Sequence, residues 1–391
     1  MIESFIIKNY RSYRDVTELS FLASKKEGGK TKDLPPVWYK EINGKRILRL
    51  LLCVGLNGTG KSKMFSALNY LRMIATAKPQ KPSDKPEYRP FLLDNFSSTK
   101  PTELALTYYI GEECFNYSIK ISSHCIEEEE LKLIQSRSSR IFYRYHNKES
   151  DKVIINYGNV CDLSKSDQRD LELNTLANAS VLSTFGALNL ESQILSKNFD
   201  YFENHISMVH KSDKNLADKL QTGDSNKDKV LKNLLLRLLD DVGTNICDYI
   251  IEEASLNISD LKANGAPDIV IKAMLEQYPS GIITHKNLRF IHSTKEGKNG
   301  LDFELESLGT KNMIRLLVVL YDVIIGEKTT CIDEIEYGIH TKALAFILKM
   351  YLTIAENCQL IVATHDLSLL NADFLRRDAV RLFEKDEYGS T

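Results

Sequence analysis

The chain is most constrained by an apolar run that leads directly into a glycine-rich turn. Residues 47–54 are almost continuously apolar, as is typical of a parallel strand buried on both faces. Residues 55–62 read Gly-Leu-Asn-Gly-Thr-Gly-Lys-Ser and match the pattern G-x-x-x-x-G-K-[ST] in full. A helical pattern follows at 61–77. The sequence therefore predicts a strand, a phosphate-binding loop and a helix in direct succession.

Each polar group of this loop has its own task. Glycines allow backbone N–H groups to turn inward around phosphate oxygens, and the following helix points its positive end at the same anion. Lys61 supplies a cation to the β- and γ-phosphates, and the Ser62 hydroxyl is expected to bind magnesium. The residues of the loop that we expect to bind the nucleotide are Gly55, Asn57, Gly58, Thr59, Gly60, Lys61 and Ser62.

A second motif lies at 329–334, where an apolar strand pattern ends in two carboxylates. At the C-terminal edge of a strand, Asp333 can hold magnesium through water, and Glu334 can orient or deprotonate the attacking water. An Asp-Glu pair that stands alone after a strand is usually a solvated turn. Because a phosphate loop is present, we prefer the interpretation in which Asp333 is a metal residue and Glu334 a catalytic residue.

Two further segments suit contacts with phosphate. Ser307, Gly309 and Thr310 stand at the start of a long apolar helix, where the serine hydroxyl and the free N–H groups can bind a second phosphate. The alternative is an ordinary Ser/Thr helix cap. His365 follows a strand predicted at 359–363, so its imidazole can contact the γ-phosphate as a catalytic residue; the alternative is a surface histidine.

The last third of the chain alternates between helices and strands, which implies an α/β fold with a mostly parallel core sheet and right-handed crossovers. The helices are expected at 310–325 and 340–355, and the strands at 329–332, 359–363 and 379–383. Alternating segments earlier in the chain predict an antiparallel side sheet. These segments are two short strands within 4–21 and further strands near 103–110, 115–121 and 153–157. Periodic runs such as 230–239 favour helix from about 171 to 277.

Composition excludes overall disorder but leaves nucleic-acid binding open. The 391 residues are 43% hydrophobic and carry a net charge of −2, so any nucleic-acid surface must be a local patch. Lysines between 211 and 232 alternate with aspartates, which favours a solvated helical face over a DNA-binding one. The acidic run 127–130 is likewise interpreted as solvated.

The cysteines and the apolar segments predict a cytoplasmic protein with no membrane insertion. Seven cysteines lie far apart without a Cys-x-x-Cys pair, as expected of buried reduced thiols. The N-terminus does not resemble a secretory signal. The most apolar stretches are too short for a membrane span and are interrupted by Arg49 and Asp322.

Taken together, these motifs resemble the ABC-type ATPases of the RecF/SMC lineage. Within that lineage, the chain is similar to the compact AAA-type ATP-binding proteins of bacterial phage-defence systems, such as RloA, AbiL and the ATPase half of OLD proteins. The turn Asn9-Tyr10-Arg11-Ser12-Tyr13 also matches the lineage, and Arg11 is a candidate nucleotide contact. Two departures are Gly338-Ile339-His340-Thr341 in place of a Leu-His-Pro ending and the lack of a clear Q-loop glutamine, for which Gln80 is a weak candidate.

The resemblance implies an ABC-ATPase head with a helical insertion. The N-terminal lobe with the phosphate loop and the side sheet is expected at 1–165, the insertion at 166–280 and the C-terminal lobe at 281–391. Such heads form a homodimer or a higher even-numbered oligomer, with ATP and magnesium between the phosphate loop of one subunit and the Ser307 segment of the other. The signature segment is the name used here for residues 307–311.

The resemblance also implies a function. The leading hypothesis is an ATP-hydrolysing switch or sensor of an antiphage defence system, of the abortive-infection type, that controls a separately encoded effector such as a nuclease. One alternative is a RecF/SMC-like ATPase of DNA repair or chromosome maintenance, which would bind nucleic acid. Another is a structural scaffold that binds ATP with little turnover. Glu334 argues against the scaffold, because a protein that does not hydrolyse ATP needs no carboxylate there.

Overall fold

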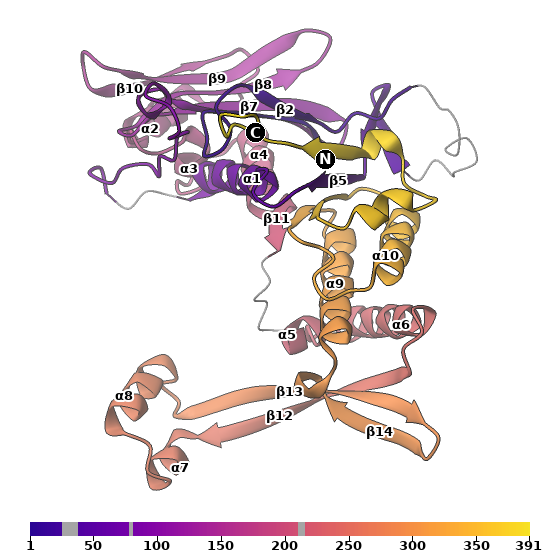
Figure 1. Cartoon of the computed structure of the whole chain (residues 1–391). Coiled ribbons are helices and arrows are strands. Elements are labelled where there is room, and N and C mark those ends of the chain that lie inside the picture. Colours follow the sequence, from indigo (N-terminus) through magenta and orange to yellow (C-terminus); the bar gives the residue numbers. More distant parts are fainter. Residues whose placement is uncertain (26–37, 78–80, 210–215) are drawn as a thin grey trace. The chain divides into compact units, whose positions relative to one another are not determined.

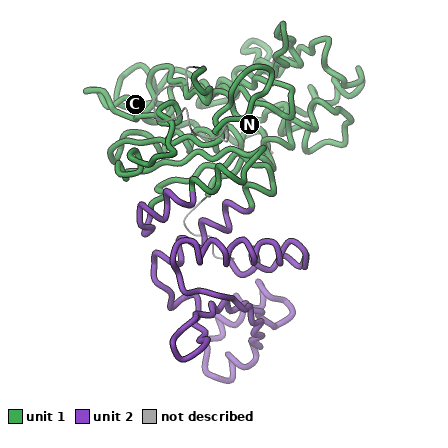
Figure 2. Tube along the Cα trace, turned by 90° about the vertical axis from the view of Figure 1, so that its right-hand side faces the viewer, with its two compact units in different colours: residues 1–210, 322–336, 348–391 green, residues 211–321, 337–347 purple. Residues whose placement is uncertain are grey.

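Figure 1 shows the computed structural model of the chain, which describes residues 1–25, 38–77, 81–209 and 216–391. The chain divides into two compact units (Figure 2). The first unit consists of Met1–His210, Asp322–Glu336 and Leu348–Thr391, and the second of Lys211–Tyr321 and Tyr337–Ile347. Both contain helices and strands, so the predicted α/β class is confirmed.

A parallel sheet forms the centre of the first unit. Its strand order is β11-β15-β16-β5-β17, and every neighbouring pair is parallel. The strands are β5 (Leu50–Gly55), β11 (Ile206–Val209), β15 (Thr329–Ile332), β16 (Gln359–Thr364) and β17 (Val380–Phe383). The strands predicted in the last third of the chain are therefore confirmed.

The apolar run at 47–54 is not one strand, as expected, but parts of two. Its start belongs to β4 (Lys45–Leu48), which pairs antiparallel with β3 (Tyr39–Ile42), and its end is β5. Arg49 separates the two strands, and its buried guanidinium donates a hydrogen bond to the carbonyl oxygen of Leu352 at 2.8 Å. One buried arginine thus divides the apolar run into two strands.

The predicted side sheet is a seven-stranded antiparallel sheet of order β10-β9-β8-β7-β6-β1-β2. Its strands are β1 (Ile2–Lys8), β2 (Thr17–Ser20), β6 (Thr102–Ile110), β7 (Glu113–Ile121), β8 (Ile126–Ile134), β9 (Ser138–Asn147) and β10 (Lys152–Tyr157). The solvated interpretation of residues 127–130 is wrong for Glu129. This residue lies in β8 and is fully buried. Its carboxylate accepts hydrogen bonds from Tyr117 Oη at 2.9 Å and from the backbone N–H of Val181 at 2.7 Å, which replace the water that burial removes.

Helix α1 (Lys61–Thr76) follows β5 as predicted and contacts β5 and β11 of the parallel sheet and β1 of the antiparallel sheet. The other helices of the first unit are α2 (Lys165–Asn174), α3 (Val181–Phe185) and α4 (Gln193–Asp200). Shorter turns are η3 (Ser97–Thr99), η4 (Tyr201–His205), η6 (Leu367–Asn371) and η7 (Arg377–Ala379). Since α3 packs on α1 and β11 is an edge strand of the parallel sheet, residues 166–209 lie with the first unit and not in a separate insertion.

The second unit contains a long antiparallel hairpin, β12 (Ile246–Asn257) and β13 (Ile282–Thr294), to which β14 (Gly297–Asp302) adds a third strand. Two helices, α7 (Ile258–Ala263) and α8 (Asp268–Gln277), lie at the far end of this hairpin (Figure 1). The remaining elements are α5 (Leu216–Leu220), α6 (Ser225–Asp241) and η5 (Phe303–Leu305). Helix was expected throughout 171–277, and this prediction is wrong for β11 and β12, whose pairing partners lie far along the chain.

Two helices have residues in both units. They are α9 (Leu308–Ile325) and α10 (Thr341–Ile354), and both agree closely with their predicted ranges.

The described part of the chain contains no helix of the length and apolar character that crossing a membrane requires. All seven cysteines are free; five are buried, and Cys161 and Cys247 are partly exposed.

A buried glutamine joins three strands of the first unit. The Gln359 side chain, in β16, is fully buried; Nε2 donates to the carbonyl oxygens of Ile2 at 3.0 Å and Leu48 at 2.9 Å. Its Oε1 accepts a hydrogen bond from the backbone N–H of Ile2 at 2.7 Å. One side chain therefore connects β1 of the antiparallel sheet, β4 and the parallel sheet, which fixes the two larger sheets beside each other.

Candidate nucleotide-binding site

The phosphate loop joins the C-terminal end of β5 to the first turn of α1, as the sequence predicts. Gly58 and Gly60 have φ angles of 81° and 103°, a region that residues with a Cβ rarely adopt. A Cβ on Gly60 would also lie 2.4 Å from Oγ1 of Thr391. Thr59 is buried, and its hydroxyl donates to the Leu56 carbonyl oxygen at 2.8 Å, whereas Asn57 is exposed at the tip of the loop. These features hold the loop in a compact turn.

Lys61 lies under this loop with only 4% of its surface exposed. Its Nζ donates hydrogen bonds to the carbonyl oxygens of Gly55 at 2.6 Å and Leu56 at 3.0 Å. Burial lowers the pKa of the Lys61 ammonium, and the nearby carboxylates of Asp333 and Glu336 oppose that change. The lysine therefore presents a cation where the loop closes, with carbonyl partners that a bound phosphate can replace.

The structure brings His365 to the same loop. His365 follows β16, and its Nδ1 lies 2.9 Å from the Gly55 carbonyl oxygen and 3.2 Å from Lys61 Nζ. β16 is the direct neighbour of β5, so parallel pairing places the ends of both strands at one edge of the sheet. Its ring is thus in contact with the loop that is predicted to bind the phosphates.

Ser62 and Asp333, the two predicted metal residues, line one cavity of about 180 Å³. The cavity lies between the start of α1 and the ends of β11 and β15, and Phe65, Asn69 and Met208 are among its other lining residues. A hydroxyl and a carboxylate are the oxygen ligands that Mg²⁺ takes from proteins when phosphates and water complete its shell. Within the described ranges, no group of three or more His, Cys, Asp or Glu residues can hold a metal by itself. The residues present therefore fit a magnesium ion that is bound together with a nucleotide.

Glu334 follows Asp333 in an unusual backbone conformation. Its φ angle is 48°, in the left-handed region that a glutamate seldom occupies. The next residue, Ile335, is buried and donates its N–H to the Ala363 carbonyl oxygen at 3.1 Å, which ties the segment to β16. Strained backbone of this kind is concentrated at functional sites. The assignment of Glu334 as the catalytic carboxylate stays a prediction.

Glu336 is a third carboxylate at this edge, and the sequence analysis missed it. Its Oε1 accepts a hydrogen bond from the backbone N–H of His365 at 2.7 Å. Its Oε2 is buried and has no hydrogen-bond partner among the described residues. The available signal was the nearness of Glu336 to the Asp333-Glu334 pair, since a third carboxylate lies within the same short turn after β15.

The N-terminal turn supports the loop from the side. Tyr10 and Tyr13 are buried, not exposed as a polar turn suggests, because Tyr13 Oη donates to the Gly60 carbonyl oxygen at 3.0 Å and Tyr10 Oη lies 3.0 Å from Ser66 Oγ. Arg11 lies in the same turn with its Nε buried and unpaired among the described residues. A nucleotide contact by Arg11 stays a prediction.

The signature segment belongs to the second unit, whereas the loop belongs to the first. Ser307 Oγ accepts a hydrogen bond from the backbone N–H of Thr310 at 3.1 Å and lies 2.8 Å from Thr310 Oγ1, so Ser307 caps α9. A Cβ on Gly309 would lie 2.8 Å from the carbonyl oxygen of Gly338, which explains why a glycine stands there. Whether these residues also bind phosphate stays a prediction, and Gln80 lies outside the described residues.

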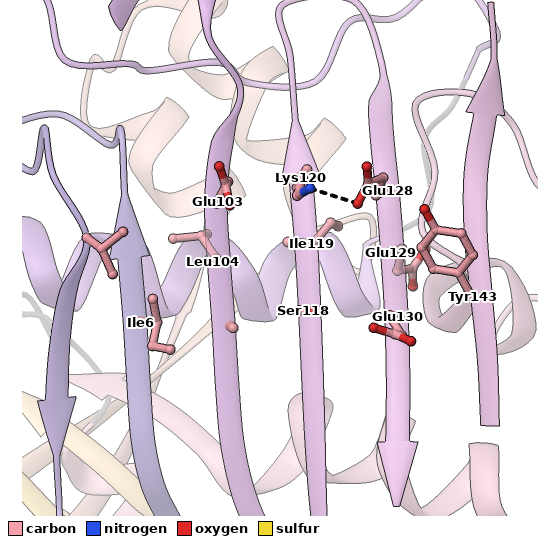
Figure 3. Close-up of a pocket in the computed structure, with 12 residues that line it drawn as sticks. Ile6, Glu103, Leu104, Ser118, Ile119, Lys120, Glu128, Glu129, Glu130 and Tyr143 are labelled. Atoms are coloured by element: carbon pink, nitrogen blue, oxygen red, sulfur yellow. Dashed lines mark ion pairs between the residues drawn. The ribbon is translucent and has the colours of Figure 1, made fainter. Parts of the chain in front are cut away.

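A larger cavity, of about 290 Å³, lies on the antiparallel sheet and has no part in this site (Figure 3). It forms where the small residues Ala105 and Ser118 are neighbours on adjacent strands. Its charged residues are paired: Lys120 with Glu128 at 2.9 Å, and Glu130 with Arg140 at 2.8 Å. Paired charges on the more exposed side of a sheet are typical of a solvated face.

Several solved structures have a distant likeness to this chain. Among solved structures, the chain is similar to the SMC head domain from Thermotoga maritima, with a TM-score of 0.42, 11% identity, and coverage of 95% of this chain and 91% of that chain. The SMC head bound to the C-winged helix domain of ScpA gives a TM-score of 0.41 and 15% identity, with coverage of 97% of this chain and 95% of that chain. The recombination mediator protein RecF gives a TM-score of 0.34 and 13% identity, with coverage of 97% of each chain. No curated protein sequence matches the chain.

One family model matches residues 54–371, and its description reads "AAA domain, putative AbiEii toxin, Type IV TA system". The match begins at the end of β5 and includes the phosphate loop, the Asp333-Glu334 motif and His365. Since the match covers most of the chain, the protein is a member of the AAA_21 family of AAA domains.

Proposed function

We propose that this protein binds and hydrolyses ATP, with magnesium as its cofactor, and that it acts as a dimeric switch. The observation that carries the proposal is the position of Ser62 and Asp333 in one cavity, together with the contact between Lys61 of the loop and His365 after β16. These are the groups that phosphoryl transfer needs: a cation for the phosphates, oxygen ligands for a metal, and a polar side chain near the γ-phosphate.

We assign each residue of the site a role. The loop N–H groups and Lys61 bind the β- and γ-phosphates, and Ser62 and Asp333 hold magnesium, which neutralises phosphate charge when bound. Glu334 accepts a proton from the attacking water, and His365 donates a hydrogen bond to a γ-phosphate oxygen. The products are ADP and inorganic phosphate.

The dimeric part of the proposal concerns the signature segment. Ser307 stands at the start of α9, an 18-residue helix, and the first N–H groups of such a helix attract anions. In the proposed dimer, each ATP contacts Lys61 of one subunit and Ser307, Gly309 and Thr310 of its partner. A two-fold dimer then contains two identical composite sites.

The biological role that we propose is antiphage defence of the abortive-infection type, in the cytoplasm, through a separately encoded effector such as a nuclease. Its support is the family description, which names an AbiEii toxin and a Type IV toxin–antitoxin system, together with the resemblance drawn from the sequence motifs. ATP-driven closure of the dimer would control the effector. A role in DNA repair is the competing outcome of the experiments below.

The test of the ATP site uses Lys61→Ala. We expect this variant to lose nucleotide binding, measured by calorimetry, and magnesium-dependent ATP hydrolysis. Lys63→Ala is the matched control, because Lys63 is an exposed lysine two positions further along α1. Hydrolysis by Lys61→Ala at the wild-type rate would show that this site assignment is wrong.

The dimeric site is tested by mixing Lys61→Ala with Ser307→Arg, each inactive alone. In a mixed dimer one composite site carries both lesions and the other carries neither. An equimolar mixture should therefore recover about a quarter of wild-type turnover, since half of the dimers are mixed and each has one intact site. Absence of recovery in mixtures shown to contain mixed dimers would contradict the composite site.

The cellular role is tested by phage challenge of bacteria that carry this gene and its neighbouring genes. Protection that requires Lys61 and a neighbouring gene supports the defence role. ATP hydrolysis that DNA stimulates, without such protection, would favour the repair role.

A further inference from the structure

A buried His–Glu pair lies immediately before the signature segment. Glu306 is 8% exposed, and its Oε1 lies 2.7 Å from Nε2 of His292, which belongs to β13. The carboxylate can only accept, so Nε2–H donates this hydrogen bond. The other ring nitrogen, Nδ1, lies 2.8 Å from Oδ1 of Asn245, just before β12. The residue that precedes Ser307 is therefore hydrogen-bonded to a histidine at the base of the hairpin.

A second contact fixes the other end of the same turn. Phe303 is buried in η5 and lies 6.0 Å from the ring of Phe290 on β13, measured between centroids. From α9, the Arg315 guanidinium carbon lies 5.3 Å from the Phe303 ring centroid, a cation–π distance. Phe290 and His292 are two residues apart on one strand, so they lie on the same face of β13. This face therefore holds the turn at both Phe303 and Glu306.

We propose that Glu306, held by His292, is a positioning residue for the signature segment. The inference rests on the proposed function, because only a composite ATP site requires Ser307 and Gly309 at a defined place. The Ser307 cap orders the first turn of α9 within itself, through Thr310, but does not orient that turn relative to the rest of the second unit. The Glu306–His292 hydrogen bond supplies this orientation, so the signature segment and the three-stranded sheet β12–β13–β14 form one rigid body.

The test compares Glu306→Ala with Glu304→Ala. Glu304 is the matched control, because its side chain is 83% exposed and lies two residues away in the same turn. Its ion pair with Lys311 of the signature segment is long, at 3.7 Å, and solvent-exposed at the glutamate, so losing it should have little effect. We expect Glu306→Ala to lower kcat for ATP about ten- to hundred-fold, the usual effect of misplacing a catalytic group. Its affinity for ATP at the phosphate loop should equal that of wild type, and Glu304→Ala should hydrolyse ATP normally. Wild-type kcat for Glu306→Ala would overturn the inference.

A conservative variant separates positioning from folding. Glu306→Gln keeps an oxygen that accepts from His292 and removes only the charge, so it should retain most of the wild-type kcat. If Glu306→Ala melts at a much lower temperature than wild type, the decision rests on Glu306→Gln and on His292→Ala. Equal loss of kcat in Glu306→Gln and Glu306→Ala would contradict a role that depends on the hydrogen bond.

Mixing provides a readout that a general structural defect would not give. In a mixed dimer of Glu306→Ala and Lys61→Ala, one site combines an intact Lys61 with an intact Glu306 and signature segment. About a quarter of wild-type turnover should return in an equimolar mixture. If Lys61→Ala with Ser307→Arg recovers activity and this mixture does not, the inference fails while the proposed function stands. If neither mixture recovers activity, the composite site itself fails.

Discussion

The backbone N–H of His365 donates a hydrogen bond to the carboxylate of Glu336, with an N···O distance of 2.7 Å. The same histidine places its ring Nδ1 2.9 Å from the Gly55 carbonyl oxygen. Glu336 therefore holds the main chain of the residue whose side chain contacts the phosphate loop. Because the bond joins the segment after β15 to the end of β16, it also fixes the carboxylate motif relative to the histidine.

The first prediction concerns this bond. Glu336→Ala should reduce kcat for ATP hydrolysis about ten- to hundred-fold, since the His365 ring would no longer be held at the loop. Nucleotide affinity should change little, because Lys61 and the loop are intact. Glu336→Gln keeps an acceptor and should be several-fold less impaired. Steady-state kinetics check this, with the exposed Glu356→Ala as a control; equal activity of Glu336→Ala and wild type would contradict it.

The second prediction concerns Glu334. Glu334→Gln removes the proton acceptor and leaves Lys61, Ser62 and Asp333 unchanged, so it should bind ATP and fail to hydrolyse it. An ATP-bound dimer should accumulate, which native mass spectrometry or light scattering can detect. Loss of nucleotide affinity, without trapping of the dimer, would contradict the role assigned to Glu334.

The third prediction separates two glycines of the loop. Gly60→Ala should unfold at a lower temperature and lose nucleotide binding, because its Cβ would meet Thr391 Oγ1 at 2.4 Å and Ser12 Oγ at 3.0 Å. In Gly58→Ala the new Cβ would meet no atom within 4 Å, so only the backbone strain at a φ of 81° lowers the free energy of unfolding, by about 1–2 kcal/mol. Thermal unfolding and ATP titration of both variants check this. Equal destabilisation by the two substitutions would show that packing around Gly60 is not tight.

The fourth prediction concerns stability in the antiparallel sheet. Arg144 is fully buried and donates to the carbonyl oxygens of Ile126, Leu176 and Ala177, and its charge opposes the rise that burial causes in the pKa of Glu129. Arg144→Met should therefore cost about 3–5 kcal/mol of the free energy of unfolding. Arg140→Met, on the exposed side of the same strand, should cost about 1 kcal/mol or less.

The loss in Arg144→Met should depend on pH. Without Arg144 the pKa of Glu129 rises further in the folded protein, so the folded state binds a proton that the unfolded chain releases at neutral pH. The deficit is therefore largest at neutral pH and shrinks as the pH falls toward the usual range of a carboxyl group. Urea unfolding of both variants at several pH values measures it, and a deficit that grows on acidification would contradict this account.

Local patterns predicted much of the fold and supplied the candidate residues of the site. Each of the correctly predicted elements is one contiguous stretch of sequence, so the periodicity of its apolar residues and the positions of its glycines indicate it. These elements are the loop 55–62, the strands of the last third and the helices α9 and α10. Each candidate site residue lies in or next to a local motif. In the structure Ser62 and Asp333 line one cavity and His365 contacts Lys61, while the roles of these residues stay predictions.

The errors share one physical cause, which is burial by partners distant in sequence. The carboxylate of Glu129 is paired by Tyr117 and Val181, and nothing in the run 127–130 reveals those partners. β12, which contains Glu252 and Glu253, is a strand and not the helix that its own sequence favours. Its partner strand β13 lies later in the chain, so the sequence of β12 alone does not reveal the pairing. The hydrogen bond of Glu336 depends on where the backbone N–H of His365 lies in the folded chain. Such relationships exist only after the sheets have formed.

The order of the parallel sheet has a consequence for synthesis of the chain on the ribosome. β5, whose residues Leu50–Val54 are 0–1% exposed in the finished protein, has β16 and β17 as its two neighbours, and both follow it much later in the chain, at 359–364 and 380–383. The nascent chain must therefore carry an unpaired, strongly apolar strand until residues 359–383 emerge. Such exposed strands are aggregation-prone and are the usual clients of chaperones. A polypeptide released before β16 is made would present the loop 55–62 on an unfinished sheet, so premature termination should yield insoluble chains without nucleotide binding.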